Sequence, residues 1–239
     1  MAQDAIRLTW LGHSAFRLTS VTGRTLLIDP WTETSPVCPE AEKKPRKVDA
    51  ILVTHGHFDH VGDAVAIAQV AKPATVLAIF EIATWLGGKG VENCVGMNKG
   101  GSFELFPGIS ATMVYADHSG AIQDGAQMIC GGDPCGYVIQ FENGLRVYHA
   151  GDTNVFGDMK LIGELYKPDV ALLPIGGLFT MGPREAAVAI RLLGVKRVVP
   201  MHYGTFPLLT GTPAALREAA SDVAGLQIIE LKPGQSTDL

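Results

Sequence analysis

The feature that most constrains this chain is a cluster of metal-ligand side chains directly after an apolar run. Residues 48–53 are mostly apolar and β-branched and lie between Pro45 and Gly56, a pattern typical of a buried strand. The segment that follows contains three imidazoles and one carboxylate within six positions: His55, His57, Asp59 and His60. Imidazole suits zinc, iron, nickel and copper, and a carboxylate adds a hard oxygen ligand. The sequence therefore predicts a metal site at the end of a strand, the usual place for a site in a layered α/β protein.

A solvated polar loop is the alternative interpretation of this cluster, and the histidine count argues against it. The whole chain has seven histidines, and three of them fall within these six positions. Short His-rich tracts are a recognised metal-binding composition. After the cluster, Asp63 is expected to cap a helix over residues 64–71. The cluster would then form a strand-to-helix loop that is anchored at both ends.

The overall composition is that of a folded protein without an excess of basic residues. Of the 239 residues, 47% are hydrophobic and 18% are charged, and the formal net charge is −5. A sizeable core is available, and the acidic balance argues against a nucleic-acid partner. No apolar run is long enough to span a membrane, and residues 1–7 lack a basic-then-apolar export pattern. Four scattered cysteines fit a reduced compartment, so we predict a cytoplasmic protein.

The two halves of the chain share an order in which several strands come first and strands then alternate with helices. Strands are expected over residues 5–10, 15–19, 24–28, 48–53, 75–79, 102–106, 109–116, 137–141, 145–149, 169–174, 197–200 and 227–231. Helices are expected over residues 64–71, 81–86, 157–167 and 183–193, and after Thr212 as N-cap. Residues 31–47 and 119–135 are expected to be long connections. We see no domain boundary and predict one domain over residues 1–239.

Ligand-type side chains recur where the expected strands end. His118, Asp152 and His202 each follow a strand, as His55 does. If these ends share one rim of a sheet, seven groups converge there: His55, His57, Asp59, His60, His118, Asp152 and His202. One metal ion usually takes four ligands, and a catalytic ion keeps one position open. Seven ligands therefore suit two ions that share a bridge.

This set of motifs resembles the metallo-β-lactamase superfamily. The resemblance is carried by His55-x-His57-x-Asp59-His60 followed by the three later ligands, and it extends from the Trp-Leu-Gly-His-Ser segment at residues 10–14 to residues 201–205. It implies an α/β fold, the αββα sandwich, with two mixed sheets flanked by helices. Residues 148–153 and 156–160 are more narrowly similar to the metal-dependent hydrolase branch that includes ascorbate-6-phosphate lactonase.

The resemblance also implies a role for each ligand. The first ion would be held by His55, His57 and His118. The second ion would be held by Asp59, His60 and His202, and Asp152 would bridge both ions. Asp59, Asp152 and His202 would also belong to the catalytic set. Asp29, at the end of its strand, would orient the histidine loop from outside the ligand shell.

The implied activity is hydrolysis at two divalent metal ions. A hydroxide that bridges the ions would attack a small ester, lactone or phosphoester. Zinc is the default ion, and manganese, iron and nickel accept the same ligands. Relatives with a di-iron redox centre resemble this motif but carry a carboxylate at the position of His57, so hydrolysis is favoured here. The expected partners are a small-molecule substrate and, on general grounds, further copies of the chain, with no nucleic acid and no membrane.

Two other functions are compatible with these motifs. The first is a nuclease or cyclic-nucleotide phosphodiesterase of the same fold, and the acidic balance argues against the nuclease. The second is a non-catalytic, metal-stabilised binding protein. Its marker would be a missing ligand, and all seven ligands are present in the sequence.

Several residues near these motifs have two interpretations each. His13 is either a proton donor or substrate contact at the site, or a surface or capping histidine. Trp31 either lines a substrate cleft or covers the edge of the core. His149 is expected to be a packed, hydrogen-bonded histidine. The spacing of Cys130 and Cys135 would allow a zinc site, but no second pair lies nearby.

Overall fold

The first of two β-sheets is built by the N-terminal half of the chain and completed by its C-terminus. The computed structural model describes residues 5–239. The strands of this sheet, in spatial order, are β16 (Ser236–Asp238), β1 (Arg7–Gly12), β2 (Ala15–Thr19), β3 (Thr25–Ile28), β4 (Ala50–Leu52), β5 (Thr75–Ile79) and β6 (Cys94–Met97). The strands from β16 to β3 pair antiparallel, and those from β3 to β6 pair parallel. β3, β4 and β5 are buried throughout, as expected for parallel strands covered on both faces.

The second sheet is built by the C-terminal half of the chain. Its strands, in spatial order, are β15 (Gln227–Ile228), β14 (Arg197–Met201), β13 (Val170–Pro174), β12 (Arg146–His149), β11 (Cys135–Gln140), β8 (Ile109–Tyr115) and β7 (Ser102–Phe106). The strands from β12 to β15 are parallel, and the others are antiparallel. This sheet is therefore also mixed, and its parallel part carries the connections that contain helices.

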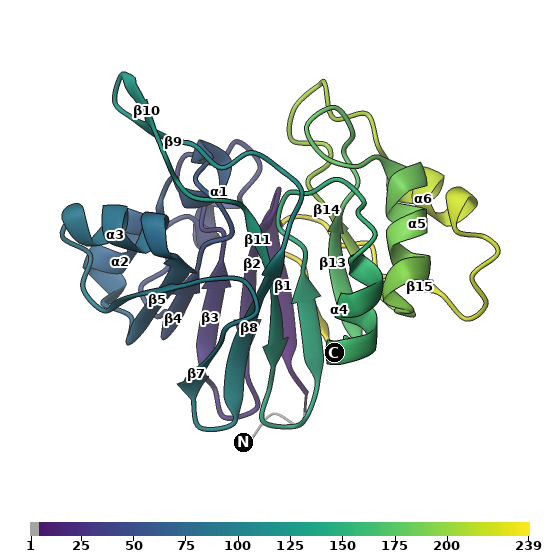
Figure 1. Ribbon diagram of the computed structural model, residues 1–239, viewed down its shortest axis with the longest axis horizontal. Helices are drawn as coiled ribbons and strands as arrows, with labels where there is room; N and C mark the ends of the chain where they lie inside the picture. Colours follow the sequence, from purple (N-terminus) through teal and green to yellow (C-terminus); the bar gives the residue numbers. More distant parts are fainter. Residues whose placement is uncertain (1–4) are drawn as a thin grey trace.

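Helices flank the two sheets on either side (Figure 1). α1 (Phe58–Val61), α2 (Ala64–Ala71) and α3 (Phe80–Gly88) belong to the connections of the first sheet. α4 (Met159–Tyr166), α5 (Pro183–Leu193) and α6 (Pro213–Ala219) belong to those of the second sheet. A short 3₁₀ helix, η1 (Glu40–Glu42), lies in the connection before β4. The αββα sandwich predicted from the resemblance is confirmed.

The interior between the sheets is closed by buried side chains and by a hydrogen bond that crosses the core. Tyr137 on β11 is fully buried, and its hydroxyl donates to the backbone oxygen of Val53, beyond β4 of the other sheet, at 2.9 Å. Beside it, the backbone N–H of Cys135 donates to the oxygen of Thr54 at 3.0 Å. A buried phenol needs an acceptor because its desolvation is otherwise uncompensated. These bonds connect β11 to the segment that leads into the histidine cluster.

Two helices have the predicted bounds, whereas strands at the edges of the sheets were missed or predicted with other bounds. α2 and α5 begin and end at the predicted residues, and Thr212 caps α6 by accepting from the N–H of Ala215. Four strands were not predicted: β6, β9 (Ile122–Asp124), its hairpin partner β10 (Gln127–Ile129) and β16. β9 and β10 lie where a plain connection was expected, and β15 is shorter than predicted. These short strands lie at sheet edges or outside the two large sheets, where the hydrophobic pattern is weak.

Asp63 stands at the N-cap position of α2, as predicted, but its side chain does not cap the helix. Its carboxylate makes no cap hydrogen bond and instead accepts from the backbone N–H groups of Thr32, Glu33 and Thr34, at 2.7, 2.8 and 3.3 Å. Asp63 thus fastens the long connection after β3 to the start of α2. The neighbouring Trp31 is only 4% exposed, which matches the interpretation that it covers the edge of the core.

Over residues 5–239 no helix combines the length and apolar character needed to cross a bilayer, and the longest of those named above, α5, has 11 residues. The prediction that residues 1–7 lack an export pattern includes residues 1–4, which lie outside the described residues.

Candidate metal centre

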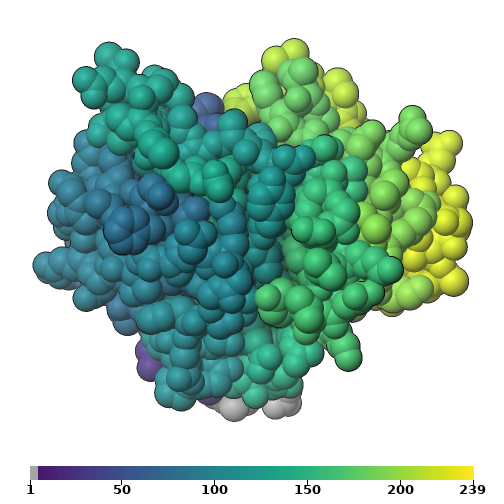
Figure 2. Space-filling model, in the orientation of Figure 1, coloured from purple at the N-terminus to yellow at the C-terminus, as the bar shows by residue number. Residues whose placement is uncertain are grey.

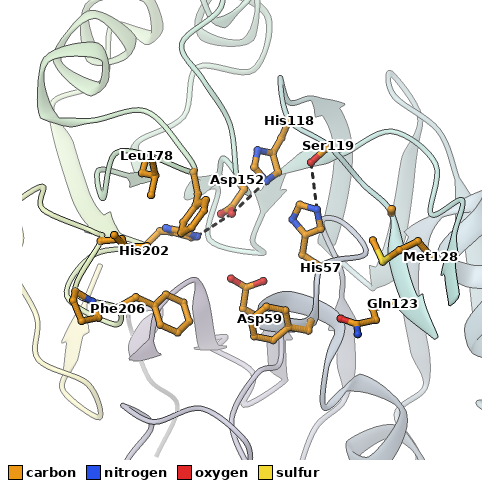
Figure 3. A pocket seen from close by; sticks show the side chains of 15 residues that line it. His57, Asp59, His118, Ser119, Gln123, Met128, Asp152, Leu178, His202 and Phe206 are labelled. Atoms are coloured by element: carbon orange, nitrogen blue, oxygen red, sulfur yellow. Dashed lines mark hydrogen bonds and ion pairs between the residues drawn. The ribbon is translucent and has the colours of Figure 1, made fainter. Parts of the chain in front are cut away.

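The side chains predicted as ligands meet at one rim of the sandwich. His55 lies just beyond β4, and His57, Asp59 and His60 lie at the start of α1. From the second sheet come His118 after β8, Asp152 after β12 and His202 directly after β14. Figure 3 shows most of these side chains pointing toward a common centre from elements far apart in the sequence. The structure therefore brings together all seven residues.

One oxygen of Asp152 occupies the centre of this cluster. Oδ2 of Asp152 lies 2.9 Å from Nε2 of His202 and 3.2 Å from Nε2 of His60. Nε2 of His118 is 3.7 Å away, and Nε2 of His55 is 4.0 Å away. The carboxyl group is 2% exposed. A single buried oxygen thus faces four imidazole nitrogens that come from both sheets.

The histidines around this oxygen fall into two groups, which are linked by a third set of close ligand atoms from His55, His60 and Asp152. The ligand atoms of His55, His57 and His118 lie within 4.8 Å of one another. The same limit encloses a second group that includes His13, which the ligand prediction left out. Its members are His13, Asp59, His60 and His202. The donor set, imidazole nitrogens with carboxylate oxygens, is the one that zinc and related divalent ions prefer.

Asp29 holds the histidine loop in place through hydrogen bonds. One of its oxygens accepts from the backbone N–H of Thr54 at 2.8 Å, and the other accepts from the Thr54 hydroxyl at 2.7 Å. The second oxygen also accepts from Nδ1 of His60 at 2.8 Å. Because Nδ1 of His60 donates to Asp29, its Nε2 is directed toward Asp152. A partner of this kind fixes the ring orientation of a ligand histidine.

Nε2 of His60 has no hydrogen-bond partner although it is buried. It lies 3.2 Å from the Asp152 carboxylate without the alignment of a hydrogen bond. Buried ring nitrogens are rarely left without a partner, so the position calls for a cation between the two groups. This orphaned atom and the donor set both fit a bound divalent metal.

Burial and the clustered charges shift the pKa values of these groups in opposite directions. Burial disfavours charge on His60, but the carboxylates of Asp152 and Asp29 outweigh it and raise its pKa well above the usual range. Burial also opposes ionisation of Asp152, but His202 and His60 lower its pKa well below the usual value. Burial lowers the pKa of His55 well below normal. The centre therefore stabilises positive charge next to Asp152, as a cation site requires.

His13 lies in the site, and the alternative of a surface or capping histidine is wrong. It is fully buried, its Nε2 lies 3.0 Å from Oδ2 of Asp59, and its Nδ1 lies 2.9 Å from the Thr205 hydroxyl. Burial lowers the pKa of His13 to about 4, so the ring is neutral at pH 7. Nε2–H then donates to the carboxylate and Nδ1 accepts from Thr205. Burial opposes ionisation of Asp59 too, yet the bond from His13 helps lower its pKa to about 2.

Backbone strain is concentrated at this centre. His13, Asp29 and His202 have φ angles of 54°, 47° and 54°, in the left-handed region that non-glycine residues seldom adopt. Gly151, next to Asp152, has a φ of 64°, and a Cβ there would lie 2.6 Å from the oxygen of Cys135. Strained residues persist only where the surroundings hold them, and they gather at functional sites.

The structure also places His149 and the two cysteines for which a zinc site had been considered. His149 is buried, its Nε2 lies 3.0 Å from the oxygen of Ser14, and its Nδ1 accepts from the N–H of Gly151. It is the packed histidine that was predicted. Cys130 is exposed and Cys135 is buried, and neither belongs to a potential ion-binding group within residues 5–239.

Three polar residues at the centre had not been singled out as supporting contacts. The Ser119 hydroxyl lies 3.3 Å from Nε2 of His57, a contact that is drawn as a dashed line in Figure 3. The Ser14 hydroxyl donates to Asp152 at 3.5 Å. The Thr54 hydroxyl connects Asp29 to Nδ1 of His55, at 2.7 and 3.0 Å. Each is adjacent in sequence to a predicted site residue, and that adjacency is the only signal that could have indicated them.

Comparisons with known proteins agree with this architecture. A family model for the β-lactamase superfamily domain matches residues 24–203. A metal-dependent hydrolase from Koribacter versatilis is 50% identical over 236 residues, which cover 99% of both chains. Another from Rubrobacter xylanophilus is 51% identical over 96% of this chain and 95% of the relative. The solved structure of Igni18, a metallo hydrolase from the archaeon Ignicoccus hospitalis, matches with a TM-score of 0.87 and 37% identity over 98% of each chain.

Fold, site and similarity together define an enzyme of the metallo-β-lactamase superfamily, and the chain belongs to that superfamily. Within it, the identity of about half of all positions over nearly the full length places this chain among the metal-dependent hydrolases. The narrower resemblance to ascorbate-6-phosphate lactonase stays a prediction.

Proposed function

We propose that the protein is a binuclear metal-dependent hydrolase that acts on a small ester, lactone or phosphoester. The observation that carries this proposal is the position of Asp152 Oδ2, which faces imidazole nitrogens of both histidine groups at 2.9–4.0 Å. A single ion would leave part of this ligand set unused, because four ligands are the usual number.

Each group would hold one ion. The first ion would be bound by His55, His57 and His118, the second by Asp59, His60 and His202, with Asp152 shared. Zinc is the default for such histidine-rich hydrolytic sites, and manganese, iron or nickel would accept the same ligands. Bound ions of this kind supply a water nucleophile at neutral pH and polarise the bond that is cleaved.

The protein's own residues would position this chemistry. Asp29 holds His60 in one orientation, and His13, which accepts a hydrogen bond from Thr205, donates to one oxygen of Asp59. These bonds fix where the second ion would bind relative to the substrate. Because His13 is neutral and its Nε2 proton is committed to Asp59, we assign His13 a positioning role.

The test is hydrolysis before and after metal removal. Protein stripped with a chelator should lose turnover of a panel of nitrophenyl esters, lactones and bis-(4-nitrophenyl) phosphate, and added zinc or manganese should restore it. His55→Ala should not be restored at the same metal concentration. Full activity of the stripped protein would contradict the proposal. Turnover of the phosphodiester without any turnover of esters or lactones would instead favour a phosphodiesterase.

A further inference from the structure

An open cavity lies directly over the candidate metal centre. It has a volume of about 890 Å³, and its floor is formed by side chains of the centre: His57, Asp59, His118, Asp152 and His202. In the space-filling view the molecule is hollowed between two projections at this rim, the teal segment of β9 and β10 and the green to yellow segments of the second sheet (Figure 2). A substrate bound at the metal centre must therefore extend into this cavity.

The walls of the cavity are apolar and come from separate segments of the chain. We call the following residues the apolar cleft: Phe58, Met128, Leu178, Phe179 and Leu208. They belong to α1, to β10, to the connection between β13 and α5, and to the connection after β14. Each is between 49% and 70% exposed. Large apolar side chains that stay exposed and surround one hollow usually mark a ligand site, because water contact with them is unfavourable.

The cleft contains no cation that could pair with an anionic substrate group away from the centre. Among the described residues that line it there is no lysine and no arginine, and the uncharged polar ones are Ser119 and Gln123. Placing an unpaired charge against apolar walls is unfavourable. A distal phosphate or carboxylate on the substrate would therefore bind less favourably there than an apolar group of the same size.

Leu178 provides independent support because it is held in an unfavourable conformation. Its φ is 56°, in the left-handed region, and its side chain is 70% exposed. Leucine gains nothing from this conformation, and a glycine or asparagine would adopt it at lower cost. Exposure and strain together are explained if the side chain contacts a ligand. Figure 3 shows Leu178 on the side of the cavity that also holds His202 and Phe206.

We propose that the substrate is an uncharged ester or lactone with an extended apolar acyl or alkyl group that lies in the apolar cleft. The reaction part of this inference rests on the proposed hydrolase function. The oxygen of water bonds to the acyl carbon, the bond from that carbon to the leaving oxygen breaks, and a proton from the water ends on the leaving oxygen. The products are a carboxylic acid and an alcohol, or one hydroxy acid from a lactone.

The first experiment compares matched esters on the zinc-loaded protein. 4-Nitrophenyl octanoate should have a kcat/KM at least ~10-fold above that of the acetate, because added methylenes in an apolar pocket are each worth a severalfold gain. The mono-4-nitrophenyl ester of suberic acid has the same chain length but ends in a carboxylate. It should lose most of this gain. Equal kcat/KM for the three esters would overturn the inference.

Two leucines provide a matched pair of variants. Leu178→Asn removes an apolar wall of the cleft at a position where asparagine tolerates the backbone. Leu165→Asn changes a leucine on α4 that is equally exposed, at 70%, but does not line the cleft. Leu178→Asn should reduce the octanoate-to-acetate ratio at least ~3-fold, which corresponds to the loss of one apolar contact, with unchanged metal content and an equal or higher Tm. Leu165→Asn should leave the ratio unchanged.

A binding measurement separates this inference from the hydrolase proposal. N-phenyl-1-naphthylamine, an uncharged fluorescent probe, should bind the zinc-loaded protein, compete with octanoate esters and bind more weakly to Leu178→Asn. Metal-dependent turnover without chain-length preference, together with probe binding that Leu178→Asn does not change, would overturn the apolar substrate and leave the hydrolase function intact. Absence of turnover for every ester, lactone and phosphoester would overturn the hydrolase function, while weaker probe binding in Leu178→Asn would still support the cleft.

Discussion

Nε2 of His202 lies 2.9 Å from Oδ2 of Asp152, although the two residues follow different strands of the second sheet, β14 and β12. Nε2 of His60, at the end of the first sheet's histidine loop, lies 3.2 Å from the same oxygen. One carboxylate oxygen therefore connects both halves of the sandwich. Removing or misplacing any partner of this oxygen should change the metal content as well as the activity.

Asp29→Asn should weaken metal binding without removing a ligand. The amide keeps the shape of the side chain but cannot accept all three hydrogen bonds from Thr54 and His60. We expect metal affinity to fall about 10- to 100-fold, as for other partners of ligand histidines. The measurement is metal titration of the stripped protein. Asp49→Asn is the matched control, because Asp49 accepts from the backbone N–H of Thr25 at 2.8 Å and lies outside the centre. Equal losses in both variants would show that Asp29 acts only through stability.

His13→Gln should weaken binding of the second ion more than binding of the first. The variant breaks the chain from Thr205 through His13 to Asp59, so the carboxylate of Asp59 is no longer held at one oxygen. Cobalt(II) titration can be followed through the visible spectrum of the bound ion. It should show one binding step with lower affinity and one with an affinity close to that of the wild type. Weakening of both steps to the same extent would contradict the positioning role of His13.

Tyr137 and Tyr148 are both fully buried, but loss of the hydroxyl should lower the free energy of unfolding only at Tyr137. Tyr137 donates to the oxygen of Val53 at 2.9 Å, so Tyr137→Phe should lower the free energy of unfolding by about 1–2 kcal/mol. The Tyr148 hydroxyl is buried without a partner, so Tyr148→Phe should be neutral or stabilising. Urea unfolding of both variants provides the measurement. A larger loss for Tyr148→Phe would contradict these hydrogen-bond assignments.

His149 should make folding less favourable in acid. Burial lowers its pKa, and its two bonds fit the neutral ring, with Nε2–H donating to Ser14 and Nδ1 accepting from Gly151. As the pH falls below about 6.5, the unfolded chain binds a proton at this histidine that the folded chain does not. Stability therefore falls with pH in this window. In unfolding of the metal-free protein between pH 7.5 and 5, the free energy of unfolding should decrease less with falling pH for His149→Gln than for wild type. Parallel pH profiles would contradict the assignment.

The positions of the site residues could be predicted from sequence because each follows a strand with a clear apolar pattern. His55, His118 and Asp152 all come at or just beyond the carboxyl end of such a strand, and a shared sheet rim brings these ends together. Helices with strong end signals, such as α5 with Pro183 at its start and Gly194 at its end, were predicted to the residue.

Features that depend on contacts between distant segments could not be predicted in this way. β16 has a polar sequence and becomes a strand only because it pairs with the open edge of β1. Asp63 stands where a helix cap is common, but three backbone N–H groups of another loop compete for its carboxylate. The sequence also did not decide between the two interpretations of His13, because its partner Thr205 is far away along the chain.

The most direct test of the central claim is metal content per chain, measured by elemental analysis on wild type, Asp152→Ala and His202→Ala purified without chelator. We predict about two equivalents for wild type, a loss of both in Asp152→Ala because one carboxylate serves two ions, and about one equivalent in His202→Ala. Circular dichroism and thermal unfolding would confirm that each variant is folded. Equal metal content in folded wild type and Asp152→Ala would contradict the bridging role of Asp152 and with it the binuclear centre.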